Sequence, residues 1–214
     1  MDFNATFQTW MNILTHPNEE AFETERMKPQ ANLTTALIWM VIAGIISGIL
    51  GFIQAQMFRS AAQGMLSMMD TADMPPEAAA ALQGMIGGIG GGAGLMSIIL
   101  TPLFFLVFAG IVYFIARALG GQGEFGRYAY LLAGIQAPIS ILSSVLGFVP
   151  FLGGCLNFFL FIYGLVLAYF ATKVEHGLTQ GKAIITIIIP MLVVFALTAC
   201  ASLLIATLMA GFSG

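Results

Sequence analysis

The most regular feature of the chain is a set of five long apolar runs separated by shorter polar segments. Each run is long enough to cross a hydrocarbon core of about 30 Å as a helix that rises about 1.5 Å per residue. We therefore predict an all-α integral membrane protein, a bundle of five transmembrane helices. The predicted spans cover residues 33–57, 94–119, 128–149, 151–172 and 183–210.

The N-terminal segment, residues 1–32, has a different pattern. Phe3, Phe7, Trp10 and Leu14 recur at helical spacing, with polar residues on the opposite face. We predict an amphipathic helix here, followed by a second, acidic helix after Pro17. The first helix has no Lys or Arg to attract anionic lipid, so docking against the bundle or a partner helix is favoured over binding to the membrane surface.

The longest connection between spans joins the first to the second. An acid and two prolines there precede a run of alanines, which predicts a short extracytoplasmic helix at residues 75–83. Residues 84–94 then contain many glycines, which are typical of either a flexible hinge or a very close helix contact. The sequence does not distinguish these two alternatives.

Composition supports the membrane assignment and adds an orientation. With 59% hydrophobic and 8% charged residues, the chain lacks the ionic surface of a soluble domain. Six of its seven Lys and Arg residues lie in three places: at the end of the N-terminal segment, around the link between spans two and three, and around the link between spans four and five. The exception is Arg59. Since basic flanks are retained in the cytoplasm, we predict a cytoplasmic N-terminus and an extracytoplasmic C-terminus.

The positions of the ionisable residues exclude several kinds of chemistry. Every Asp, Glu, Lys, Arg and His lies at the end of a predicted span or outside it, so proton relays and buried acid–base catalysis are not expected. Cys155 and Cys200 have neither metal-ligand nor disulfide spacing. A net charge of −3 argues against nucleic acid as a partner. We expect no enzyme activity, no metal and no cofactor.

Small residues and prolines mark specific places within the spans. Gly44, Gly48 and Gly51 have the spacing that lets another helix approach closely, either within the chain or in a dimer.

Pro102, Pro138 and Pro190 lie inside three predicted spans, where each permits a kink. Gln136 and Asn157 could then satisfy each other or the carbonyls that a kink frees. The alternative is a substrate site at the kink.

Several short motifs resemble the Yip family of five-span membrane proteins, in its prokaryotic branch. The motifs are the polar start of span three, with Glu124, Arg127 and Tyr128; Pro138 and Pro150; and the segment from His176 through Lys182 to Pro190. Trp10, Leu14 and Pro17 also fit the opening of prokaryotic members. The resemblance implies the five-span fold and a membrane location, here the prokaryotic plasma membrane.

The resemblance also bears on partners. Eukaryotic members associate with Rab GTPases and with one another through a longer N-terminal region than the 32 residues here, which argues against a Rab-type partner. We expect a non-enzymatic membrane scaffold or interaction partner that contacts the lipid bilayer and either a second copy or another membrane protein. The alternative is a small-solute or ion channel or carrier, or a subunit of a transport complex.

If the protein recognises a partner, we expect the polar cytoplasmic links to form the contact face. Exposed aromatic and Arg side chains commonly anchor such surfaces. The candidate residues lie in the two inner links and on the amphipathic helix that would cover them: Phe7, Trp10, Glu124, Arg127, Tyr128, His176 and Lys182. The alternative is structural, an ion pair of Glu124 with Arg127 or Lys182 that holds the links together.

Overall fold

Every regular element in the described part of the chain is a helix. The computed structural model describes residues 3–68, 93–149 and 152–212. The helices in these residues are α1 (Phe3–Thr15), α2 (Glu19–Arg26), α3 (Leu33–Met68), α5 (Ala93–Ala118), α6 (Phe125–Leu146), α7 (Leu152–His176) and α8 (Gln180–Phe212). The predicted short helix at residues 75–83 and the glycines of 84–92 lie outside the described residues.

Five of these helices are long and apolar enough to cross a bilayer, which confirms the predicted five-span architecture. Helix α3 continues to Met68, well beyond the predicted end of the first span at residue 57. The polar residues that follow Met57, such as Arg59 and Gln63, mark the end of an apolar run but do not break a helix. The chain is therefore a multi-pass membrane protein with at least one helix longer than its apolar run.

Helix α6 is the centre of the bundle. Residues 128–135 are buried without interruption, while α3 and α7 pack along its sides. The sequence permits this because Ala129, Ala133 and Ala137 are too small to hold neighbouring helices apart. Larger side chains between them, including Tyr128 and Tyr130, fill the core.

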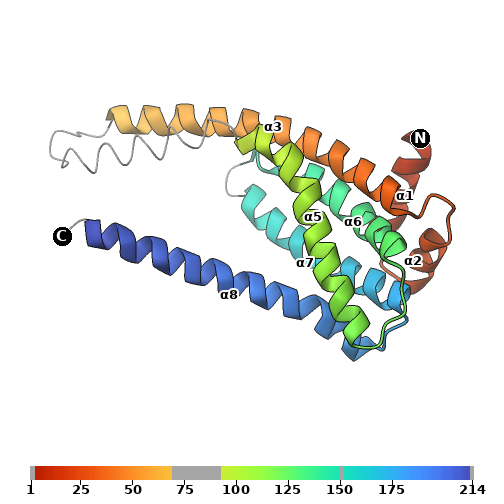
Figure 1. Ribbon diagram of the computed structural model, residues 1–214. Coiled ribbons are helices and arrows are strands. Elements are labelled where there is room, and N and C mark those ends of the chain that lie inside the picture. The colour runs from red at the N-terminus through yellow and green to blue at the C-terminus, as the bar shows by residue number, and fades with distance from the viewer. Residues whose placement is uncertain (1–2, 69–92, 150–151, 213–214) are drawn as a thin grey trace.

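Helix α8 packs against the bundle only along its first half. Ala183, Thr186, Ile187 and Pro190 are buried at helical spacing against α5 and α7. From Met191 onward, every side chain of α8 that the structure describes is exposed. Figure 1 shows the second half of α8 diverging from the other helices.

The two ends of the bundle differ in character. Helices α1 and α2, the link between α5 and α6, and the turn between α7 and α8 gather at one end, which we call the charged end (Figure 1). It holds all six described Glu residues and six of the seven Lys and Arg residues, Arg59 being the exception. Large exposed apolar side chains instead occupy α3, α5, α7 and α8 beyond it. This division is the one expected where helices leave a bilayer.

Candidate interaction surface at the charged end

A buried carboxylate holds the charged end together. The side chain of Glu175, near the end of α7, has no exposed surface. Its Oε1 accepts a hydrogen bond from the backbone N–H of Glu124 at 2.8 Å and another from Arg127 Nε at 3.2 Å. Because a buried charge is costly unless it is paired and hydrogen-bonded, these contacts fix the end of α7 against the start of α6.

Helix α2 supplies a third contact to the same carboxylate. Arg26 Nη1 lies 3.7 Å from Glu175 Oε2, which is too long for a hydrogen bond but close enough for ionic attraction. Arg26 also donates two hydrogen bonds to Glu23. These bonds raise the pKa of the Arg26 guanidinium above its ordinary value. Glu175 therefore joins α2, α6 and α7, three segments far apart in the sequence.

A second buried carboxylate joins the two N-terminal helices. Glu25, which is 1% exposed, accepts hydrogen bonds from Asn12 Nδ2 at 2.8 Å and Lys28 Nζ at 2.7 Å. Lys28 Nζ also contacts Thr9 Oγ1 at 3.2 Å. Asn12 and Thr9 belong to α1, so this cluster fixes α1 against α2.

His176 and Tyr128 are interior residues. Their rings lie 4.7 Å apart, and the Tyr128 hydroxyl pairs with Thr172 Oγ1 at 2.9 Å. Neither ring nitrogen of His176 has a hydrogen-bond partner within the described part of the chain. A Cβ added at Gly123 would lie 2.6 Å from His176 Nδ1, so the glycine lets the α5–α6 link close over the imidazole. Both aromatic residues are therefore unavailable for direct contact with a partner.

Lys182 closes the same end from α8. Its Nζ donates to the carbonyl of Leu119 at 2.8 Å, next to Gly120, whose φ of +93° favours glycine. A Lys beside free carbonyls at a helix C-terminus is favourable. The structure records no ion pair of Lys182 with Glu124 in its described residues. Glu124 Oε2 instead lies 3.3 Å from Arg127 Nη1, and the Glu124 side chain is 64% exposed.

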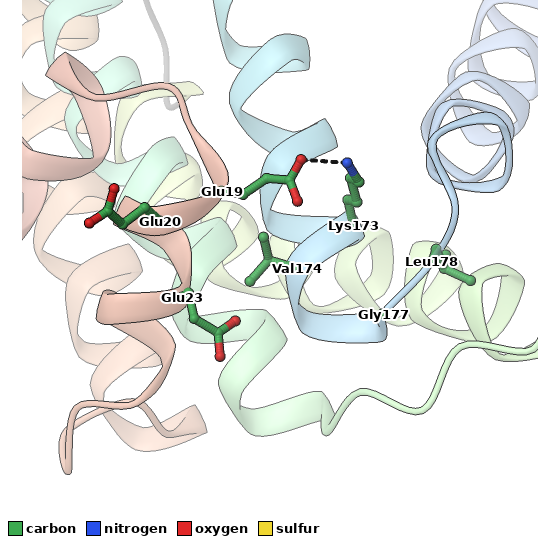
Figure 2. A pocket seen from close by; sticks show the side chains of 7 residues that line it. All are labelled: Glu19, Glu20, Glu23, Lys173, Val174, Gly177 and Leu178. Carbon is green, nitrogen blue, oxygen red and sulfur yellow. Dashed lines mark hydrogen bonds and ion pairs between the residues drawn. The ribbon is translucent and has the colours of Figure 1, made fainter.

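An open groove of about 520 Å³ lies between α2 and the end of α7. Figure 2 shows Glu19 turned toward Lys173 across this groove, and the two side chains form an ion pair. Its lining residues are Glu19, Glu20, Glu23, Lys173, Val174, Gly177 and Leu178. The groove is predominantly acidic, and its carboxylates come from the N-terminal segment.

The predicted contact face is not one continuous surface. Glu124, Arg127, Tyr128 and His176 do come together, but Tyr128 and His176 are buried. Phe7 and Trp10 lie elsewhere, because α1 packs alongside α6, where Ile13 contacts Gly134. The expectation that α1 covers the polar links is therefore wrong: α2 does so, because it carries Arg26 and Glu19, the partners of the two α7 side chains.

The predicted stripe of α1 also differs from its buried face. Thr9 and Ile13 are fully buried, whereas Phe7 and Met11 are 52% and 43% exposed. Periodicity alone places Phe7 in the apolar stripe, but the small residue Gly134 and the hydrogen bond of Thr9 with Lys28 favour burial of the neighbouring face.

The candidate packing glycines differ in their surroundings. A Cβ at Gly44 would lie 3.4 Å from the carbonyl oxygen of Ile98 in α5, which is a close contact within one chain. Gly48 is also buried. Around Gly51 the structure places nothing within 4 Å of such a Cβ.

The three prolines lie inside α5, α6 and α8: Pro102, Pro138 and Pro190. Gln136 and Asn157, expected to satisfy each other near Pro138, have different surroundings. Gln136 is exposed, and Asn157 Nδ2 donates to the carbonyl of Ser143.

Sequence reasoning missed Glu175, Glu25 and Arg26 as the residues that organise this end. The signal was present, since Glu175 is an acid within an otherwise basic inner segment, between Lys173 and Lys182. The rules that predict membrane orientation count Lys and Arg and give acids little weight, so they do not identify Glu175 as important. The acids of the N-terminal segment fit the pattern of a polar helix, which does not predict that one of them is buried.

Comparison with known proteins gives the family. A family model, the Yip1 domain, matches residues 11–201, which is most of the chain. No curated protein and no solved structure matches it. The extent of the match agrees with the motifs at Glu124, Arg127, His176 and Lys182, and with the five-span architecture. The chain therefore belongs to the Yip1 domain family.

Proposed function

We propose that this Yip1-family membrane protein is a non-enzymatic scaffold that binds another protein at its charged end, and that this end faces the cytoplasm. The observation that supports the proposal most is the acidic groove on a rigidly held surface. Helix α2 supplies Glu19, Glu20 and Glu23 to the groove and is fixed in place through Arg26 and Glu175. A pre-formed surface loses little entropy when a partner binds.

The chemistry of the groove suggests the kind of partner. Glu20 lies on its exposed side with no basic partner in the described residues, whereas Glu19 is paired with Lys173 and Glu23 with Arg26. A basic segment of another protein complements this potential, and such complementarity gives specificity and fast association. A second copy of the chain could supply the segment only through its own few basic residues, so we favour a different membrane or peripheral protein.

Transport is the alternative function, and the distribution of polar groups favours the scaffold. The fully buried polar or charged side chains of the described residues all lie toward the charged end: Thr9, Glu25, Thr172, Glu175, His176 and Thr186. A carrier commonly has ionisable or polar groups at mid-membrane depth, where a substrate or coupling ion binds. This pattern supports a protein that acts at one surface.

The test is quantitative recovery of partners from native membranes with a groove variant. Glu20→Lys reverses one charge in the groove, and no side-chain contact of Glu20 is needed for the fold in the structure. Gln122→Lys is the matched control, because it places the same side chain at an exposed position of the charged end outside the groove. We expect wild type and Gln122→Lys to recover the same stoichiometric partner and Glu20→Lys to lose it. Equal recovery by all three, or no stoichiometric partner for any, would contradict the proposal.

A further inference from the structure

Two faces of helix α1 pack against other helices, and a third is largely exposed. The first face packs on α6 through Ile13, which lies so close to Gly134 that a Cβ added to that glycine would be 2.6 Å from Ile13 Cδ1. The second face meets α2 through the hydrogen bond from Asn12 to Glu25. Together these contacts fix the rotation of α1 about its own axis.

The third face carries two large apolar side chains that are substantially exposed. Phe7 and Met11, one helical turn apart, are 52% and 43% exposed. At about 100° per residue, Phe7 points about 120° away from Ile13 and about 140° away from Asn12. The face therefore points away from Ile13 and Asn12, the residues through which α1 meets α6 and α2.

The position of α1 along the spans shows what surrounds this face. Trp10 packs edge-on against Trp39 of α3, with ring centroids 5.9 Å apart, and Trp39 is itself buried in the core. At the other end of α1, the carbonyl of Leu14 accepts a hydrogen bond from the Tyr163 hydroxyl at 2.6 Å.

Tyr163 itself lies between Ile162 and Val166 of α7, which are 43% and 42% exposed. The end of α1 thus lies beside α7 where the outer surface of that span is apolar.

We propose that the Phe7 and Met11 face of α1 is inserted in the acyl region of the membrane leaflet at the charged end. Helix α1 is then an interfacial helix held between the bundle and the lipid. Because α1 contains no Lys or Arg, its insertion depends on apolar burial and not on anionic headgroups. The occupant of this face is therefore phospholipid acyl chain, whatever the headgroup charge.

The experiment uses spin labels on the full-length chain in vesicles. Cys155 and Cys200, both exposed and unpaired, are first replaced by Ala. Single cysteines are then introduced as Phe7→Cys, Met11→Cys and, as the matched control on the exposed polar side of the same helix, Gln8→Cys. Each nitroxide-labelled protein is reconstituted in pure phosphatidylcholine vesicles and in vesicles that also contain phosphatidylglycerol. Collision rates are measured with oxygen, which partitions into acyl chains, and with a water-soluble nickel chelate.

We expect the ratio of oxygen to nickel collisions to be several-fold higher at positions 7 and 11 than at position 8, and equal in the two vesicle types. A label at position 7 as accessible to nickel as the label at position 8 would show a water-facing helix and overturn the proposal. Shielding of positions 7 and 11 from both reagents would show that protein covers the face, and would overturn it too. A dependence on phosphatidylglycerol would contradict the claim that headgroup charge is irrelevant. Thermal unfolding of each labelled variant, compared with the unlabelled protein, checks that the fold is retained.

Discussion

At the scale of single residues, two buried carboxylates determine how the charged end is assembled. Glu175 and Glu25 have almost no exposed surface, and the Oε1 atom of each accepts hydrogen bonds from donors of another segment. The Oε2 atom of each has no hydrogen-bond partner among the described residues. Burial of an unpaired carboxylate costs several kcal/mol, so such residues persist only where their partners are held in place. Each carboxylate therefore reports whether the segments around it are folded together.

Replacing Glu175 by Gln should destabilise the protein far more than replacing Glu124 by Gln, although Arg127 contacts both. Glu175→Gln removes the charge that Arg127 and Arg26 share in a buried site, and we expect a loss of about 1.5–3 kcal/mol. Glu124 is mostly exposed, where an ion pair contributes about 0–1 kcal/mol. Unfolding of both variants in the same detergent checks this. Equal losses for the two variants would mean that Glu175 is not the organising residue.

Glu175 also shows which kind of residue could not be predicted from the sequence motifs. The motifs selected Glu124 and Arg127, whose Oε2 and Nη1 atoms lie 3.3 Å apart. They did not select Glu175, because its importance depends on α2 lying over the end of α7. That contact joins residues about 150 positions apart, as in the Lys173–Glu19 pair, so the local pattern shows an unusual acid but not the partners that bury it.

At the scale of helices, close contacts depend on a few glycines. The turn between α6 and α7 is an example: Gly153 donates its backbone N–H to the carbonyl of Val149 at 2.8 Å. A Cβ at Gly153 would overlap the carbonyl oxygen of Leu146, whereas one at Gly154 would have nothing within 4 Å. Two adjacent glycines in one helix therefore have opposite tolerance for a side chain.

Gly153→Ala should lower the free energy of unfolding by about 1–3 kcal/mol, because the methyl group forces the α6–α7 turn to open. Gly154→Ala should be neutral or stabilising by about 0.5–1 kcal/mol, since Ala favours a helix over Gly. Thermal or denaturant unfolding of the two purified variants distinguishes them. The reverse order of stability would show that α6 and α7 do not meet as described.

A second pair tests how α1 docks on α6. Gly134→Ala should cost about 1–3 kcal/mol by overpacking against the end of the Ile13 side chain. Ile13→Val removes the contacting methyl group, so the double variant should be less unstable than the sum of the two single changes. Limited proteolysis within residues 1–32, measured alongside unfolding, shows whether α1 has detached. Strict additivity of the two changes would rule out direct contact between these residues.

At the scale of the whole molecule, the sequence predicted the number of spans well and their packing only in part. The bilayer requires every span to have the same minimum apolar length. The existence of α3, α5, α6, α7 and α8 can therefore be predicted from the length and composition of the apolar runs. The separation of the second half of α8 from the bundle does not follow, because its apolar run continues unchanged past Pro190. In lipid, an apolar helix needs no protein neighbour, so hydropathy cannot distinguish packed from unpacked segments.

Orientation across the membrane is a prediction for the whole molecule. With six of seven bases at the charged end, we expect a cysteine introduced as Thr179→Cys to be cytoplasmic and one introduced as Ser213→Cys to be external. In a background without Cys155 and Cys200, a membrane-impermeant thiol reagent applied to intact cells should label position 213 and not 179. Labelling at position 179 would reverse the orientation and place the acidic groove outside the cytoplasm.

The central claim is that the protein acts through contacts at its charged end and does not carry solutes. The most direct measurement is flux through proteoliposomes that contain the purified protein, with small ions and neutral and charged organic solutes, compared with empty liposomes and with liposomes that hold a known pore. We expect no flux above that of empty liposomes for wild type or for Glu20→Lys. Reproducible, saturable flux of any of these solutes by the wild-type protein would contradict the scaffold function.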